Sequence, residues 1–346
     1  MKKIKKKSKS GRIIFAEAIL LLLLCGRVLY KSHYSVDVFY SNEDYIKWVD
    51  FNVSYEALQK AYEWDKDTYG QEIHLNWIEM LAYLAVKNGG NFSSYKNKQM
   101  DELAKLLLEG EDTTASLMKD NKYYKYYLEA YGAVLGGMVG EYEIETDGKW
   151  EKCYGLKAFH PIAKGYEYSD YDDFGSSRSY GYKRPHLGHD MMGQTGTPII
   201  AIESGTIEAL GWNQYGGWRI GIRSFDKKRY YYYAHLRQNF PYNKSLKEGD
   251  AVQAGDVIGY MGHTGYSKEE NVNNIEITHL HWGMELIFDE SQKDGNNEIW
   301  IDCYQLTRFL YQNRCETWKE TETKEYHRTH QFRDIDNRQY LKGAMP

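Results

Sequence analysis

Residues 197–210 read TPIIAIESGTIEAL, two short runs of apolar and β-branched residues divided by a glycine. Similar runs recur from about residue 150 to about residue 310, namely GGWRIGIRSF, KRYYYYAHLR, DVIGYMGHTG and HLHWGMELIF. Short runs of this kind, punctuated by tight turns, are typical of antiparallel strands. The sequence therefore predicts an antiparallel β-sheet domain over residues 151–312.

The preceding segment, residues 31–150, has a helical pattern instead. In EIHLNWIEMLAYLAVKNGG, residues 72–90, apolar side chains recur at spacings of three and four until the sequence reaches Gly89. QMDELAKLLLEG repeats the pattern, and SYEALQKAYEWD begins with Ser54, a residue type that caps helices well. We therefore expect a helical region followed by a β domain, which makes the chain a multidomain α+β protein.

The N-terminus carries a strong charge asymmetry. Residues 1–12 are rich in lysine and contain no acid, and the apolar segment IIFAEAILLLLLCGRVLY follows at residues 13–30. A basic segment before an apolar one of this length predicts a single transmembrane signal anchor with a cytoplasmic N-terminus. A cleaved signal peptide is one alternative, and a lipoprotein signal with Cys25 as the lipidated residue is another. In all three cases the remaining chain lies outside the cytoplasm.

The overall composition argues against two other classes of protein. The 346 residues carry a net charge of -5 at pH 7, and this acidic balance gives no general indication of nucleic-acid binding. Beyond Cys25 there are only Cys153, Cys303 and Cys315, too few for a disulfide scaffold, although a Cys303–Cys315 bridge stays open. The charged, weakly patterned segment 313–346 is expected to form a peripheral C-terminal extension.

The segment HLGHD, residues 186–190, offers candidate metal ligands. In an extended segment alternate side chains point the same way, so His186 and Asp190 would share one face. Gly188 lies between them and would leave room for a metal ion to approach both. His189 would point to the opposite face and take no part.

Two further segments contain histidines that would share a strand face with a residue two positions away. In HLHWG, His279 and His281 share a face, and in KRYYYYAHLR His235 shares its face with Tyr233. Four histidines and one aspartate can therefore converge from three strand-like segments. Zinc in a hydrolytic site usually takes three protein ligands and keeps a fourth position open, so two histidines would be left for other work.

Together these motifs resemble the lysostaphin-type (LytM-like) zinc metallopeptidases, a family of peptidoglycan endopeptidases. The resemblance covers about residues 155–290 and rests on HLGHD, GTPIIAIESGTIEALGWN, YYAHL, LKEGDAVQAGDVIGYMGHTGYS and HLHWG. It implies one zinc ion per chain, held by His186, Asp190 and His281. It also implies that His235 and His279 are the catalytic residues that do not bind the metal.

The activity that the resemblance implies is metal-assisted hydrolysis of peptide bonds in peptidoglycan cross-links or stem peptides. His279, with His235, would take a proton from water or stabilise the developing oxyanion. Arg184 and Tyr233 are the predicted substrate-binding residues. The polar, tyrosine-rich segments 170–185 and 265–278 are the expected walls of the substrate groove.

The implied partners are peptidoglycan and, through residues 13–30, the cell membrane, with the catalytic domain facing the cell wall. The alternative is a catalytically silent domain of the same type that acts as an envelope scaffold or activates another wall hydrolase. Such domains usually lack a metal ligand, and this sequence lacks none. The hairpin EGDAVQAGDVIGYMG also resembles biotinyl carriers, but it has no lysine at its tip. The remaining histidines of the β domain, His160, His189 and His263, are expected to be packed or exposed side chains.

Overall fold

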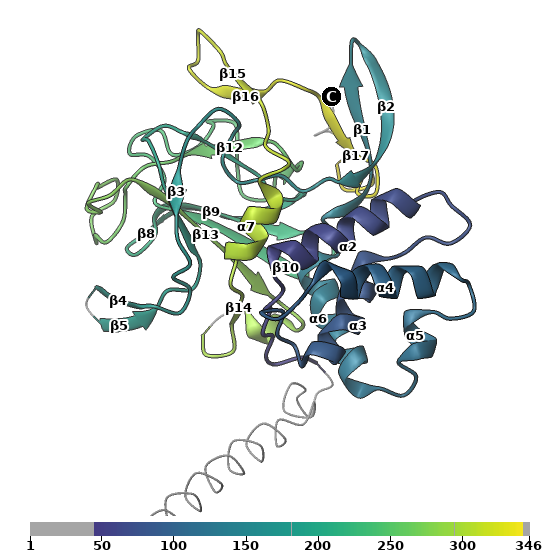
Figure 1. The fold of residues 1–346 in the computed structure, drawn as a ribbon. Coiled ribbons are helices and arrows are strands. Elements are labelled where there is room, and N and C mark those ends of the chain that lie inside the picture. The colour runs from purple at the N-terminus through teal and green to yellow at the C-terminus, as the bar shows by residue number, and fades with distance from the viewer. Residues whose placement is uncertain (1–44, 181, 294, 342–346) are drawn as a thin grey trace, which may run out of the picture. The chain divides into compact units, whose positions relative to one another are not determined.

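The structure is a computed structural model that describes residues 45–180, 182–293 and 295–341 (Figure 1). The predicted basic segment 1–12 and the predicted anchor 13–30 lie outside these residues. Within the described ranges, none of the helices is both long enough and apolar enough to cross a bilayer. From Val49 onward the chain belongs to one structural unit, and the elements below are all part of it.

The upstream region is helical, as the apolar spacing predicts. Ser54 caps the first helix by accepting a hydrogen bond from the Ala57 amide at 3.3 Å. The second helix ends at Gly89, whose φ of 61° places it in the left-handed region that favours glycine. The helices are α2 (Tyr55–Thr68), α3 (Trp77–Asn88), α4 (Asn97–Leu108), α5 (Thr114–Leu117) and α6 (Lys122–Leu135). Their apolar faces pack together, with α3 against both α2 and α6.

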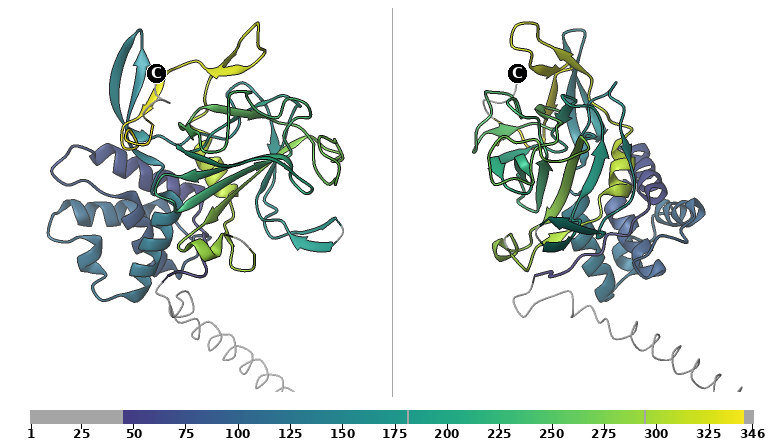
Figure 2. Two further views of the ribbon diagram at one scale, coloured as in Figure 1. Left: turned by 180° about the vertical axis from the view of Figure 1, so that it is seen from behind. Right: turned by 90° about the vertical axis from the view of Figure 1, so that its left-hand side faces the viewer.

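The central element downstream is an eight-stranded antiparallel sheet with the strand order β11-β8-β9-β10-β13-β6-β3, to which β14 adds by pairing with β13 (Figures 1 and 2). Its strands are β3 (Ser169–Asp170), β6 (His189–Met192), β8 (Gly205–Asn213), β9 (Gly217–Ser224), β10 (Arg229–Ala234), β11 (Ala251–Val252), β13 (His279–Leu286) and β14 (Ile299–Trp300). The quoted stretch 197–210 supplies β8 and, before it, β7 (Pro198–Ile200), which pairs with β12 (Val257–Tyr260). The predicted antiparallel β domain is therefore confirmed.

One face of this sheet is apolar and covered. Leu280 and Trp282 on β13 are fully buried, and the Trp282 indole donates to Thr307 Oγ1 at 3.2 Å. Thr307 belongs to α7 (Tyr304–Leu310), which also contacts α2 of the helical region. Because strand residues alternate, covering this face leaves His279 and His281 on the other one.

The C-terminal segment differs from the expected peripheral extension. Its strand β17 (Phe332–Asp334) pairs with the hairpin of β1 (Val139–Thr146) and β2 (Lys149–Leu156), and β15 (Thr317–Lys319) pairs with β16 (Tyr326–Arg328). The ammonium group of Lys157 lies 2.9 Å from the Asp334 carboxylate, and both side chains are buried. Strands of three residues are too short to give a periodic signal, so the sequence pattern showed only their charges.

The cysteines within the described residues make no disulfide. Cys153, Cys303 and Cys315 are all free, so the Cys303–Cys315 bridge left open by the sequence does not form. The remaining short hairpin, β4 (Ser177–Tyr180) with β5 (Tyr182–Pro185), leads directly into HLGHD.

Candidate metal centre

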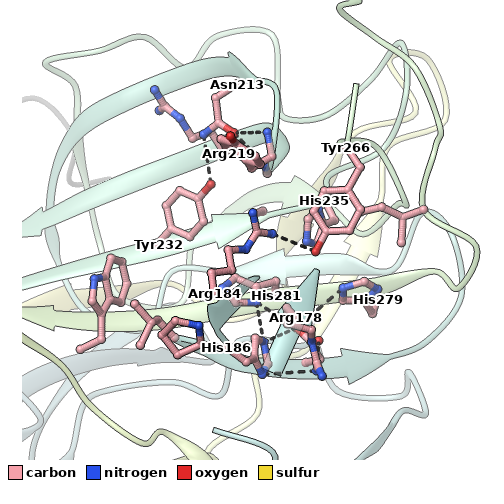
Figure 3. A pocket seen from close by; sticks show the side chains of 18 of the residues that line it. Arg178, Arg184, His186, Asn213, Arg219, Tyr232, His235, Tyr266, His279 and His281 are labelled. Carbon is pink, nitrogen blue, oxygen red and sulfur yellow. Dashed lines mark hydrogen bonds and ion pairs between the residues drawn. The ribbon is translucent and has the colours of Figure 1, made fainter. Parts of the chain in front are cut away.

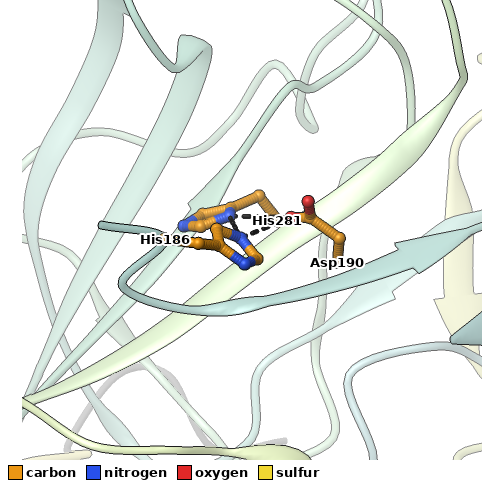
Figure 4. Close-up of side chains that lie close together, drawn as sticks. All are labelled: His186, Asp190 and His281. Atoms are coloured by element: carbon orange, nitrogen blue, oxygen red, sulfur yellow. Dashed lines mark hydrogen bonds and ion pairs between the residues drawn. The ribbon is translucent and has the colours of Figure 1, made fainter. Parts of the chain in front are cut away.

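Three side chains from two paired strands and the segment before them meet on the open face of the sheet (Figure 4). Asp190 on β6 and His281 on β13 are direct cross-strand partners, and His186 comes just before β6. His281 Nδ1 lies 2.9 Å from Asp190 Oδ1, and His186 Nε2 lies 3.0 Å from both of these atoms. The structure thus brings together the three residues predicted as metal ligands.

The donor set fits a zinc ion. The three candidate ligand atoms, two imidazole nitrogens and a carboxylate oxygen, all lie within 4.8 Å of one another. Ligand atoms around tetrahedral zinc are separated by about 3.3 Å, given bonds near 2.0 Å, so the spacing needs only a small adjustment. His, Asp and an open fourth position form the ligand set of a hydrolytic zinc site rather than a closed structural one.

The local backbone differs from the expected continuous strand. Residues 186–188 lie outside β5 and β6, with a bend at Gly188, so strand alternation does not place His186. A Cβ added to Gly188 would lie 2.5 Å from His281 Cε1, so the glycine makes room for the imidazole ring of a ligand rather than for the ion. His189 does point away, and its Nε2 lies 2.8 Å from Asp170 Oδ2.

The protonation of the three residues follows from their mutual contacts. Burial would raise the pKa of Asp190, but hydrogen bonds from His186 and His281 outweigh burial and hold that pKa far below its usual range. Burial lowers the pKa of His281, and the hydrogen bond to Asp190 only partly opposes this. For His186 burial is outweighed by the carboxylates of Asp190 and Asp173, so its pKa is raised. An anionic carboxylate is therefore in place, as metal binding requires.

Two residues that the sequence did not single out support His186. Its second nitrogen, Nδ1, lies 3.0 Å from Asp173 Oδ1, which orients the ring with Nε2 toward the other two candidate ligands. Arg178 contacts the other oxygen of Asp173 and lies 3.3 Å from Asp190 Oδ2. The only sequence signal for Asp173 was its place in the acidic run at the start of segment 170–185.

The two histidines outside the ligand set lie beside it. Their rings are 4.7 Å apart, and the His235 ring is 5.8 Å from the His281 ring. His235 Nδ1 lies 3.0 Å from the Thr264 carbonyl and His279 Nδ1 lies 2.8 Å from the Ile277 carbonyl. Because a carbonyl only accepts, Nδ1 carries the proton in both rings, which leaves Nε2 as the basic nitrogen. Burial, together with the charges of His279 and His281, lowers the pKa of His235 well below its usual value.

The prediction that Tyr233 binds substrate is wrong. Tyr233 is fully buried on the core face, where its hydroxyl accepts from the Ile202 amide at 3.0 Å. The neighbouring Tyr232 faces the cavity instead. The alternation used for the prediction breaks at His235, which follows the end of β10 with a φ of 61°, so His235 and Tyr233 do not share a face.

The candidate ligands lie in a cavity of about 780 Å³ (Figure 3). Both predicted wall segments contribute to it, for example through Tyr171 and Arg184 from the first and Tyr266 and Ile277 from the second. Arg184 donates from Nη2 to the Tyr266 hydroxyl at 2.9 Å and stacks over the rings of Tyr215 and Tyr266. Tyr232 and Arg219 also line the cavity, and no sequence motif indicated Arg219.

The other histidines of the β domain are held by structural contacts. His160 is fully buried, and His263 Nδ1 lies 2.8 Å from the Ile275 carbonyl. Neither lines the cavity among the described residues, which agrees with the expectation that they are packed side chains.

Comparison with known proteins shows what this domain is similar to. Residues 184–294 match peptidase family M23. The L-Ala–D-Glu endopeptidase of Bacillus subtilis is 38% identical over 124 residues, which are 36% of this chain and 36% of that protein. Lysostaphin of Staphylococcus simulans is 45% identical over 83 residues, 24% of this chain and 16% of lysostaphin. The chain thus matches 36% of the length of the first relative and 16% of the length of the second.

A solved structure extends the similarity in fold to the helical region. A crystal structure from Ruminococcus gnavus, proposed to be the glycyl-glycine endopeptidase LytM, superposes with a TM-score of 0.52 at 23% identity. The superposition covers 77% of this chain and 90% of that one. The combination of upstream helices and an antiparallel sheet is therefore shared with another protein.

Proposed function

We propose that the domain matching peptidase family M23 is a zinc-dependent endopeptidase that hydrolyses peptide bonds in peptidoglycan. Peptidases of this family are zinc metallopeptidases. The observation that carries the proposal is the meeting of His186, Asp190 and His281 beside two further histidines in one open cavity. A scaffold protein has no need to keep all five.

Each residue has a role that its contacts allow. His186, Asp190 and His281 would hold the zinc ion, which supplies Lewis-acid activation of water and of the scissile carbonyl. His279, whose Nε2 lies 3.7 Å from Asp190 Oδ1, is placed to take a proton from the attacking water. His235 stays neutral at working pH because its pKa is depressed, so it acts through the lone pair of Nε2 and not as a cation.

Peptidoglycan as the substrate is supported by what the relatives are named for. The Bacillus subtilis relative is an L-Ala–D-Glu endopeptidase, and a relative from Staphylococcus capitis, 37% identical over 94 residues, is a glycyl-glycine endopeptidase. The bonds named for these two relatives differ. The groove walls at 170–185 and 265–278 must then decide between stem peptides and cross-links.

The test is digestion of purified cell walls of defined cross-link type by the full, zinc-loaded chain, with the products identified by mass spectrometry. We expect new amino termini from one kind of peptide bond. His281→Ala should release none of them, because removing a ligand costs the metal. Lys247→Gln, an exposed position outside the cavity, is the matched control and should behave as the wild type. If zinc-loaded wild type releases nothing beyond His281→Ala, the domain is a silent scaffold or activator.

We further propose that residues 13–30 anchor the chain in the cell membrane with the catalytic domain outside, on the strength of the basic segment before the apolar one. Full chain with a C-terminal tag should remain in carbonate-washed membranes, and protease added to intact spheroplasts should remove the tag. Recovery of a shortened chain from the medium would instead identify a cleaved signal peptide.

A further inference from the structure

Arg219, on β9, has an unusual environment within the cavity. Its Nη1 is buried and has no hydrogen-bond partner among the described residues. Elsewhere in the domain, buried arginines are neutralised; Arg229, for example, lies 2.7 Å from Glu203 and 2.8 Å from Asp226. The Arg219 side chain is half-buried and lines the cavity, and no carboxylate of the described residues lies within ion-pair distance of it. An arginine without a counter-charge in a cavity is available to an anionic ligand.

Two further donors face the same space (Figure 3). The Tyr232 hydroxyl accepts from Asn213 Nδ2 at 3.2 Å, and its own proton has no acceptor among the described residues. The charges of Arg219 and Arg184 both act on this phenol, where they oppose the rise in pKa that burial causes. Arg184 itself is held by two tyrosine rings and a hydroxyl, none of which neutralises its charge. The three groups thus line the same cavity, and the charges of both arginines act on the phenol between them in the electrostatics of the site.

The remaining charged groups of the cavity do not cancel this charge in the same way. Lys293 contacts Glu208, and Arg178 is engaged by Asp173 and Asp190. The Glu298 carboxylate accepts from the Trp300 indole at 2.7 Å. Glu276 is exposed, and Glu285 is buried. Among the described residues, Arg184 and Arg219 are therefore the cations of the cavity that have no carboxylate within ion-pair distance.

We propose that Arg219, Tyr232 and Arg184 form a subsite for a substrate carboxylate, so that the enzyme prefers peptides with an acidic residue next to the scissile bond. This inference rests on the proposed function. The Tyr232 ring is 6.0 Å from the ring of the candidate ligand His281, a span of about two residues of extended chain. A carboxylate bound here thus lies within one or two residues of the bond at the metal. Guanidinium groups suit this role because they bind carboxylates with two parallel hydrogen bonds.

The test uses two stem-type peptides that differ in one group, a free carboxylate next to the scissile bond or the corresponding primary amide. For the zinc-loaded full chain we expect kcat/KM to favour the acid by roughly 10- to 100-fold, the usual range for a charged hydrogen bond. Arg219→Gln should remove most of this preference, through a higher KM for the acid peptide. Arg184→Gln should weaken it as well, while Lys247→Gln should leave it intact.

Binding of both peptides to the metal-free full chain, followed by fluorescence anisotropy, separates this inference from the proposed function. If both peptides are cleaved equally well, or if the preference survives in both arginine variants, the subsite is wrong although the peptidase stands. If nothing is cleaved but the metal-free chain still favours the acid in an Arg219-dependent way, the subsite stands and the peptidase falls. If the metal-free chain binds both peptides equally and the zinc-loaded chain cleaves neither, both the subsite and the peptidase proposal are wrong. Unfolding midpoints show which variants remain folded. If a variant is unfolded, the comparison of acid and amide peptides with the wild-type chain still tests the subsite.

Discussion

Two groups of buried histidines in the β domain look alike by burial and differ in their partners. His160, fully buried, has Nδ1 3.0 Å from the Ile162 carbonyl and Nε2 3.0 Å from the Tyr168 hydroxyl, so both of its nitrogens are engaged. His235 is 6% exposed, and only its Nδ1 has a hydrogen-bond partner among the described residues. Burial therefore does not distinguish a functional histidine from a structural one. A ring nitrogen without a hydrogen-bond partner does distinguish them, because a buried histidine with a purely structural role would have partners for both nitrogens.

The same contrast applies to the carboxylates behind the histidines. Asp173 orients His186, whose other nitrogen meets Asp190 and His281, whereas Asp170 contacts His189 on the opposite side of the strand. The two pairs have similar geometry, at 3.0 Å and 2.8 Å. Only the first can influence a bound metal ion.

The largest effect that would sharpen this contrast concerns the open nitrogens. His279→Gln and His235→Gln should each lower kcat by about 10²- to 10⁴-fold, the range for loss of a general acid or base. Zinc content, measured by atomic emission, should stay at one per chain because neither residue is in the donor set. His327→Gln, on the exposed hairpin of β15 and β16, serves as the control. Loss of zinc together with activity would show that the open-nitrogen residues are ligands instead.

An intermediate effect compares the two carboxylates. Asp173→Asn should weaken zinc binding by about 10- to 100-fold, as is usual when the partner of a ligand histidine is lost. Asp170→Asn should leave zinc affinity unchanged, since its partner His189 points away from the site. Competition with a chromophoric chelator measures both. Equal effects of the two substitutions would remove the distinction drawn between these pairs.

The smallest effect concerns stability and His160. Burial lowers the pKa of His160 to about 3, whereas an unfolded histidine titrates near 6.5. Below about pH 6.5 the unfolded chain therefore binds a proton that the native chain does not, so His160 makes the folded state less stable as pH falls toward 3. His160→Gln should reduce the pH dependence of the unfolding free energy by about 1.4 kcal/mol per pH unit below pH 6.

Urea unfolding of the metal-free chain at pH 6 and pH 5 measures this difference in slope. His330→Gln, at an exposed position, should leave the slope as in the wild type. If His160→Gln and wild type lose stability in parallel between these pH values, the buried imidazole is not held neutral.

Much of the site could be predicted from the sequence because its donors belong to local motifs. HLGHD and HLHWG each place two candidate ligands or catalytic groups within a few residues. Asp190 and His281 lie on β6 and β13, where side chains alternate between the two faces of the sheet, so the face of each could be predicted. The covered face of the sheet could be predicted in the same way, from the apolar residues between the histidines.

Other features were decided only by the tertiary structure. The choice of Tyr232 over Tyr233 depends on a backbone turn at His235, whose positive φ ends the alternation. Asp173 approaches the site from the loop between β3 and β4, and Arg219 approaches it from β9, so contacts between distant segments place both residues. Local sequence patterns specify which chemical groups are present and which strands carry them. Their distances and their unsatisfied partners arise from contacts between residues far apart in the chain, which local patterns do not encode.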